Sequence, residues 1–280
     1  MLDNISAAIL RQLDYLSKHY EWVPFEQLKK RLDYNEKIIK KKIKELLRKE
    51  YIQGIPHAKY NEWAFKITSK GLDAIAFHDL QKNKVVKKLL NPIGMGKEAE
   101  VYLALDFDDN PIVVKKHLFD RAKFKKIAKS LAYASIKWRA KQLGKKLYEI
   151  NVPRAKAQIE SYVLEKLYYM GFHVPKPISI NRHIVVMEAI LDNGFPAKQL
   201  SKLKPDKELG LKILEEYDNI VKKAKIVHGD LSPFNILVKG GEYYFIDWAQ
   251  AVPSDYEEAN ILYKRDIENI KKFFHLDDTM

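Results

Sequence analysis

Two polar residues in the segment VHGDLSPFNIL, residues 227–237, have the types and the spacing that phosphoryl transfer requires. Asp230 and Asn235 match the D-x-x-x-x-N pattern, in which the acid orients the attacking group and the amide holds a magnesium ion. Twelve residues after Asn235, the segment YYFIDWAQAV predicts a strand that ends at Asp247, the position of a second magnesium ligand. Together these residues predict a phosphoryl-transfer site.

A glycine-rich turn upstream indicates how the phosphates of a nucleotide would be held. In NPIGMGKEAEVYLALD, Gly94 and Gly96 let the backbone approach a phosphate, and Lys97 adds positive charge. Two glycines alone are weak support, because hairpin turns use glycine for the same backbone freedom. About twenty residues later, however, a strand-like run carries Lys115 at the position of the kinase lysine that binds the α- and β-phosphates.

That lysine needs an acidic partner to hold it in place. The amphipathic helix predicted for residues 155–172 offers Glu160, with Glu165 as the alternative. A buried strand predicted for RHIVVMEAI then runs into a short linker, whose backbone around Glu188 to Ile190 is expected to contact adenine. These elements together predict the nucleotide-binding lobe of a kinase.

The chain before this lobe has a different pattern, which predicts a winged helix over residues 1–80. A first helix has apolar residues at helical spacing, a short second helix begins just past Pro24, and a third spans DYNEKIIKKKIKELLRKEYI. Two short strand-like runs, YIQGI and WAFKIT, follow as a hairpin. Helix, helix, basic helix and hairpin in this order are typical of a winged helix.

The third predicted helix has a basic face in the recognition position of that fold. Its apolar face is Ile39, Ile43, Leu46 and Leu47, and its basic face is Lys37, Lys40, Lys41, Lys44 and Arg48. Lysines there would mostly contact phosphates, which gives affinity for nucleic acid without base specificity. The alternative is a winged helix that contacts protein.

Composition supports a polyanionic partner. The net charge is +13, and residues 116–146 contain 11 basic residues and one acid, Asp120. Nucleic acid is the usual partner of such a segment, although a lysine-rich, solvated surface is the alternative. The absence of cysteine excludes disulfides, thiolate zinc sites and cysteine nucleophiles. Without a signal peptide or a long apolar run, the expected location is the cytoplasm, with no membrane association.

Two features of the sequence differ from protein kinases, and both concern how a protein substrate would be bound. Gly229 stands where protein kinases usually have arginine, which removes the usual link to a phosphorylated activation loop. Only 33 of the 280 residues follow Asp247, and they contain no Ala-Pro-Glu motif. This stretch is expected to form about two helices and no peptide-binding platform.

The motifs IGMGKEAEVY, VHGDLSPFNIL and IDWAQAV, behind a winged helix, closely resemble the RIO family of atypical protein kinases. The winged helix is similar to that of the second subfamily, and the lack of a long C-terminal tail is similar to archaeal forms. The resemblance implies an α+β fold with a winged helix over 1–80, a linker over 81–90 and a trimmed bilobal kinase domain over 91–280. Its lobes would divide near residue 188.

The resemblance also implies a function, with ATP and Mg²⁺ as cofactors. It implies a role in maturation of the small ribosomal subunit, with the pre-ribosomal subunit and its rRNA as partners and a monomer away from the ribosome. By motif, nucleotide contacts fall on Lys97, Lys115, Glu160 and Ser232, catalysis on Asp230, and magnesium on Asn235 and Asp247. Asp247 would itself accept phosphate during ATP hydrolysis.

Two details depart from this family, and two alternatives compete with it. Ala99 replaces an expected serine, and the basic segment from Asp120 to Arg154 is longer than expected, with Ser130 or Ser135 as candidate phosphosites.

A small-molecule kinase of the aminoglycoside or choline type shares the late motifs, but it needs a larger C-terminal region. A non-catalytic RNA-binding protein with a kinase-like fold should have lost at least one of the expected catalytic groups. All five are present: Lys115, Glu160, Asp230, Asn235 and Asp247.

Overall fold

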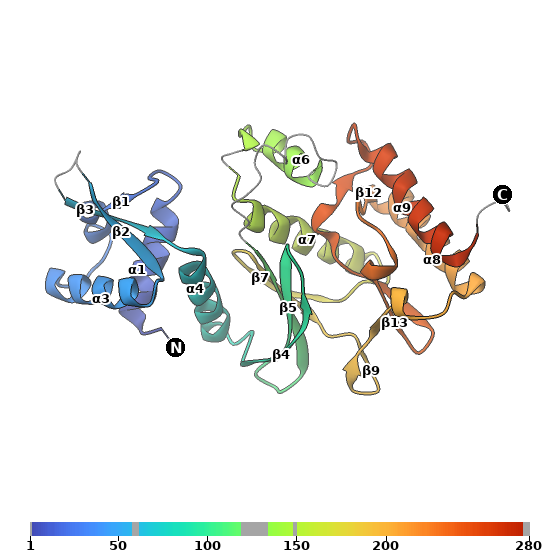
Figure 1. Cartoon of the computed structure of the whole chain (residues 1–280), viewed down its shortest axis with the longest axis horizontal. Helices are drawn as coiled ribbons and strands as arrows, with labels where there is room; N and C mark the ends of the chain where they lie inside the picture. Colours follow the sequence, from blue (N-terminus) through green and yellow to red (C-terminus); the bar gives the residue numbers. More distant parts are fainter. Residues whose placement is uncertain (1, 58–61, 119–133, 148–149, 277–280) are drawn as a thin grey trace. The chain divides into compact units, whose positions relative to one another are not determined.

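The computed structural model describes residues 2–57, 62–118, 134–147 and 150–276 (Figure 1). The chain divides into two compact units, Met1–Val86 and Lys87–Met280, and each is described separately. The linker predicted for residues 81–90 contains the end of one helix of the first unit and the start of one strand of the second. Within the described residues, no helix combines the length and apolarity needed to span a membrane.

The first unit is a winged helix, as predicted. Its helices are α1 (Asn4–Leu16), α2 (Phe25–Lys29), α3 (Glu36–Arg48) and α4 (Ser69–Lys82), and its strands are β1 (Val23–Pro24), β2 (Ile52–His57) and β3 (Glu62–Ile67). The strands form an antiparallel sheet in the order β1-β3-β2. Asn35 caps α3 and Thr68 caps α4 through side-chain oxygens that accept backbone N–H groups. Buried residues from α1, α2 and α3 form the core.

The second unit begins with a five-stranded antiparallel sheet in the order β4-β5-β6-β8-β7. The strands are β4 (Lys88–Met95), β5 (Ala99–Leu105), β6 (Pro111–His117), β7 (Pro177–Asn181) and β8 (Ile184–Glu188). The helices α6 (Ala134–Gln142) and α7 (Val152–Tyr169) lie between β6 and β7 in the chain. Asn151 caps α7, and Pro153 suits the first turn because its missing N–H has no helical acceptor there.

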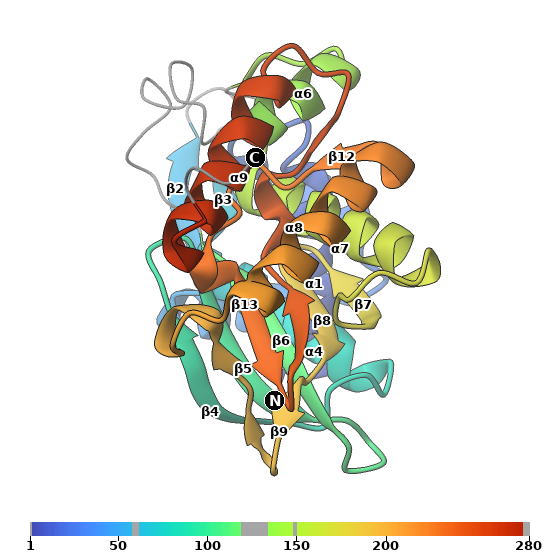
Figure 2. The ribbon, with the colours of Figure 1, turned by 90° about the vertical axis from the view of Figure 1, so that its right-hand side faces the viewer.

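The rest of this unit consists of two long helices and short strands (Figure 2). The helices are α8 (Lys207–Asn219) and α9 (Ala259–Phe274), and the strands are β9 (Leu191–Asp192), β10 (Phe195–Pro196), β11 (Lys198–Gln199), β12 (Ile226–Val227), β13 (Ile236–Lys239), β14 (Glu242–Phe245) and β15 (Val252–Pro253). The prediction of about two helices after Asp247 is wrong for the described residues. They form the one long helix α9, preceded by a short 3-10 turn, Trp248–Gln250.

One hydrophobic cluster joins the two lobes of the second unit. It includes Ile159, Val163 and Leu167 of α7 together with Tyr217 of α8 and Phe274 of α9. Side chains this deeply buried each contribute on the order of 2 kcal/mol to folding through removal of apolar surface from water. The predicted division near residue 188 therefore falls within a continuous core, which keeps α7 fixed against the C-terminal helices.

Candidate active site

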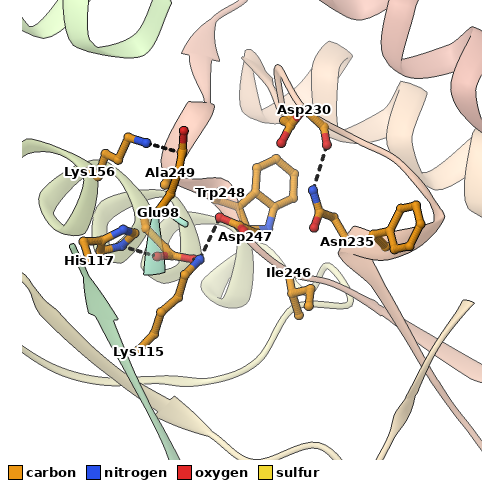
Figure 3. A network of polar contacts seen from close by, with 12 residues as sticks. Glu98, Lys115, His117, Lys156, Asp230, Asn235, Ile246, Asp247, Trp248 and Ala249 are labelled. Carbon is orange, nitrogen blue, oxygen red and sulfur yellow. Dashed lines mark hydrogen bonds and ion pairs between the residues drawn. The ribbon is translucent and has the colours of Figure 1, made fainter. Parts of the chain in front are cut away.

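The centre of the site is a buried lysine between two carboxylates. Lys115 on β6 places its Nζ atom 2.7 Å from Oε1 of Glu160 and 2.7 Å from Oδ1 of Asp247. Figure 3 shows Lys115 pointing at Asp247. The side chains of Lys115 and Glu160 are 7% and 0% exposed, whereas Asp247 is 42% exposed. Glu165, the alternative partner, is exposed on the same helix, so the structure selects Glu160.

The charges of these three groups depend on one another. Burial lowers the pKa of Lys115, but the two carboxylates outweigh burial and hold the pKa above its usual value. Burial raises the pKa of Asp247, but the Lys115 ammonium outweighs this effect and lowers it to about 2. The pKa of Glu160 is likewise lowered by Lys115 in spite of burial. At neutral pH the three groups are therefore charged and carry a net charge of −1, which favours a cation.

His117 completes this network, and the sequence analysis missed it. Its Nε2 atom lies 2.8 Å from Oε2 of Glu160, and its ring is almost fully buried. Both oxygens of Glu160 are thus held, one by Lys115 and one by His117. The sequence could have indicated this contact, because His117 is two residues after Lys115 on a strand and therefore lies on the same face.

A short hairpin brings the predicted metal ligands together. Asn235 immediately precedes β13 and Asp247 follows β14, and Ile236 pairs with Phe245 in the antiparallel register. The N–H of Ile246 donates to the carbonyl of Asn235 at 2.9 Å, which closes the ends of the hairpin. The twelve-residue spacing seen in the sequence is therefore the length of this hairpin.

The loop that carries Asp230 is held from α9 by Asp266, which the sequence analysis also missed. The buried Asp266 carboxylate accepts hydrogen bonds from the N–H groups of Gly229 at 2.8 Å and Leu231 at 3.0 Å, and from the Tyr217 hydroxyl at 2.6 Å. Its neighbours on α9 add two bonds to the same loop, from Arg265 to the Gly229 carbonyl and from Asn269 to the Leu231 carbonyl. The backbone on both sides of Asp230 is therefore fixed.

The side chains of this loop face a cavity. The Asn235 amide donates its Nδ2 hydrogen to the Asp230 carbonyl at 2.8 Å (Figure 3). Surrounding protein raises the pKa of the Asp230 carboxyl, and the nearby Asp247 charge adds to the rise. Ser232 precedes the turn that contains Asn235, but it is not part of the cavity wall.

The cavity has a volume of about 700 Å³, which is within the range of small-molecule sites. The sequence-predicted residues that line it are Gly94, Gly96, Lys97, Lys115, Glu160, Glu188, Ile190, Asp230, Asn235 and Asp247. The glycine-rich turn, the strand lysine, the linker after β8 and the acidic loop thus meet around one space. Nucleotide-binding roles for these residues remain predictions.

The residues present fit a magnesium ion. Asp247 supplies a carboxylate, and Asn235 retains its amide oxygen because only its Nδ2 atom is engaged with Asp230. Within the described ranges, His, Cys, Asp and Glu do not form a group of three that could bind a metal without further ligands. Two oxygen donors suit Mg²⁺, which in kinases is shared between a few side chains and the substrate phosphates.

The two other sets of predicted residues lie elsewhere. The basic side chains of α3, Lys37, Lys40, Lys41, Lys44 and Arg48, are all exposed, and Lys40 pairs with Glu36 at 2.6 Å. Ser130 lies outside the described residues. Ser135 is fully buried on α6 and donates to the Ala249 carbonyl at 3.1 Å, so its use as an accessible phosphosite is wrong for this conformation. The segment 120–154 also contains helix α6 and the start of α7, rather than loop alone.

Known proteins resemble this chain in sequence and in structure. The RIO domain family model matches residues 100–279, and the Rio2 N-terminal family model matches residues 1–83. The RIO-type serine/threonine-protein kinase Rio2 of Methanocaldococcus jannaschii is 31% identical over 92% of this chain and 91% of its own length. The serine/threonine-protein kinase RIO2 of Saccharomyces cerevisiae is 28% identical over 83% of this chain, which spans 54% of that protein.

A solved structure of a Rio2 kinase also resembles this chain. The Rio2 kinase of Chaetomium thermophilum in an ADP/Mg²⁺-phosphoaspartate complex superposes with a TM-score of 0.77 and 25% identity. The match covers 99% of this chain and 81% of that chain.

Gly229 yields a stability prediction for the acidic loop. Its φ is +78°, and a Cβ atom there would lie 2.6 Å from the Gln250 carbonyl oxygen, which excludes the arginine of protein kinases. We expect Gly229→Ala to lower the free energy of unfolding by roughly 3 kcal/mol or more, from left-handed strain and overlap together. Gly241→Ala is the matched control, because its φ is +90° but no atom lies within 4 Å. Equal losses in chemical denaturation would show that the Gln250 contact has no effect.

Proposed function

Because this chain belongs to the RIO family, with an N-terminal domain of the Rio2 type, we propose that its active-site cavity binds ATP with Mg²⁺ and transfers the γ-phosphoryl group. The observation that carries the proposal is the pair of 2.7 Å contacts from Lys115 to Glu160 and Asp247, in the wall of a cavity that the glycine-rich turn also lines. Glu160 would hold the ammonium beside the α- and β-phosphates, and the backbone of Glu188–Ile190, which lines the same cavity, would contact adenine.

Asn235 and Asp247 are the residues that would hold the metal. Bound there with the phosphates, Mg²⁺ would neutralise negative charge that develops during transfer. The Asp247 carboxylate suits this role because its low pKa keeps it ionised at neutral pH and nearly half of its side chain is open to the cavity.

We propose that Asp247 is also the first acceptor of the phosphoryl group. A carboxylate oxygen of Asp247 attacks the γ-phosphorus, the bond to the β–γ bridging oxygen breaks, and ADP leaves. Asp230 then takes a proton from a water molecule as the water oxygen attacks the phosphorus of the acyl phosphate. The bond between that phosphorus and the Asp247 oxygen breaks, so inorganic phosphate leaves and the Asp247 carboxylate is restored. Three observations support this route: Asp247 is ionised, Ser135 is buried, and the C. thermophilum relative forms a phosphoaspartate complex.

We further propose that the chain acts on the precursor of the small ribosomal subunit in the cytoplasm, as a monomer when it is away from the ribosome. The exposed basic face of α3 and the net charge of +13 suit rRNA phosphates. An enzyme that hydrolyses ATP while bound to RNA would then be released from the precursor once its ATP has been hydrolysed. The alternative is a slow protein kinase that phosphorylates itself in the basic segment.

The metal assignment predicts that tight ATP binding requires Mg²⁺. Asp247→Asn removes a charged ligand without changing shape, and should abolish turnover while ATP still binds through adenine and Lys115 contacts. Calorimetry with and without Mg²⁺, followed by a turnover assay, measures both effects. Asp108→Asn is the control, because this exposed carboxylate lies in the β5–β6 turn outside the cavity. Full turnover by the protein without Mg²⁺ would contradict the assignment.

The chemical step predicts a trapped acyl phosphate. We expect Asp230→Ala to slow hydrolysis of the intermediate by roughly 10²- to 10⁴-fold, the usual contribution of a general base. After a single turnover with γ-labelled ATP, label on the protein should be released by hydroxylamine, which cleaves acyl phosphates and spares phosphoserine. Asp247→Asn should carry no such label. Label that resists hydroxylamine and maps to serine would disprove the phosphoaspartate route.

The basic face of α3 predicts salt-dependent RNA binding. Replacing Lys37, Lys40, Lys41 and Lys44 with alanine should weaken rRNA binding and reduce the log–log salt slope by somewhat under one unit for each lost contact. The matched control is alanine at Lys18, Lys30, Lys70 and Lys82, which removes the same charge from exposed positions of the same unit. If the two quadruple variants bind identically, α3 does not contact the RNA phosphates.

A further inference from the structure

A second cavity, of about 740 Å³, lies in the Lys87–Met280 unit and shares no lining residue with the active site. Figure 1 shows α6 and α7, the two helices that form one side of it. The residues that matter for its chemistry are Trp138 and Arg139 from α6, Tyr162 and Lys166 from α7, Lys225 just before β12 and Asp255 just after β15. The cavity is as large as the one assigned to ATP, but the proposed reaction gives it no role.

The wall combines positive charge with aromatic rings. Arg139, Lys166 and Lys225 face one acid, Asp255, so the ionised lining carries a net charge of +2. Tyr162 is 57% exposed although it lies on a helix whose other side belongs to the core. Cations beside accessible aromatic rings are typical of sites that bind unpaired nucleotides, where a ring stacks on the base and the cations contact the phosphates.

Arg139 adds a half-buried guanidinium group to the wall of the cavity. Its Nε atom is buried, and within the described residues no acceptor lies within hydrogen-bonding distance of that atom. Because that atom is closed to solvent, a ligand in the cavity would be met by the rest of the guanidinium group, whose terminal nitrogens are also donors. Lys166 differs, because it already donates to the Ala224 carbonyl at 2.7 Å and is fixed in the wall.

We propose that this cavity binds an unpaired nucleotide of single-stranded RNA, with the base on Tyr162 and the phosphate at Arg139 and Lys225. Duplex RNA does not fit this chemistry, because its bases are stacked within the helix and present no free face. The proposal rests on RNA as the partner of this protein, as proposed above, but it concerns a site separate from α3.

The test uses a short single-stranded oligoribonucleotide that contains 2-aminopurine, whose fluorescence is quenched by stacking on an aromatic ring. The full chain is titrated with excess ADP and Mg²⁺ present, so that the probe does not enter the active-site cavity. We expect Tyr162→Ala to abolish quenching and to weaken binding by roughly five-fold or more, the usual effect of losing one base–aromatic stack. Tyr162→Phe should restore both, because the ring and not the hydroxyl is required.

Two matched controls separate the cavity from the general surface. Tyr169→Ala removes a ring that is 78% exposed on the same helix but does not line the cavity, and should leave quenching unchanged. Arg139→Gln should weaken binding and lower the salt slope by somewhat under one unit, whereas Lys141→Gln, an equal charge change at an exposed position of α6, should have a smaller effect.

The outcomes distinguish this proposal from the one about α3. If Tyr162→Ala and Arg139→Gln bind and quench as the unmodified protein does, while the α3 quadruple variant loses binding, the cavity proposal is wrong and the α3 proposal stands. Equal binding of the matching duplex would also overturn the cavity proposal. If polyglutamate binds with the same dependence on Arg139 and Tyr162, and RNA does not, the cavity is a site for an acidic peptide instead.

Discussion

The buried ammonium of Lys115 is the constraint on which the rest of this unit depends. A cation this deeply buried is tolerated only with close anionic partners, and these come from positions 45 and 132 residues later in the chain. The fold must therefore bring α7 and the end of β14 to the same face of β6. The continuous hydrophobic cluster from α7 to α8 and α9 does this, and His117 then fixes the second oxygen of Glu160.

A second buried acidic side chain, Asp266, orders the other half of the site. The described residues after Asp247 form one long helix, α9, which holds the Asp230 loop through Asp266, Arg265 and Asn269. The left-handed Gly229 lets that loop pass close to the Gln250 carbonyl, where any side chain would collide. Helix α9 thus supports the backbone of the Asp230 loop on both sides of Asp230.

The sequence predicted most of the residues that the structure brings together around the cavity, because they stand at fixed distances within local motifs. The strand lysine, the D-x-x-x-x-N loop and the Asp247 hairpin are each short enough for spacing to imply geometry. Helical periodicity alone does not distinguish Glu160 from Glu165, since it does not say which face meets the sheet, and the family resemblance was needed to select Glu160. Asp266 was missed for a related reason: its three donors lie 35 to 49 residues earlier, so only the packing of α9 brings them together.

The helices that carry catalytic contacts on one side form the second cavity on the other. On α7, Glu160 binds Lys115, and two residues later Tyr162 lines the second cavity. On α6, Ser135 binds the carbonyl of Ala249, two residues after Asp247, while Arg139 lies one turn further along in the second cavity. Helices α6 and α7 also pack against the Trp248–Gln250 turn that follows Asp247, so each helix contacts both the active-site region and the second cavity. The two cavities therefore have a direct physical connection through two helices and do not need a longer pathway.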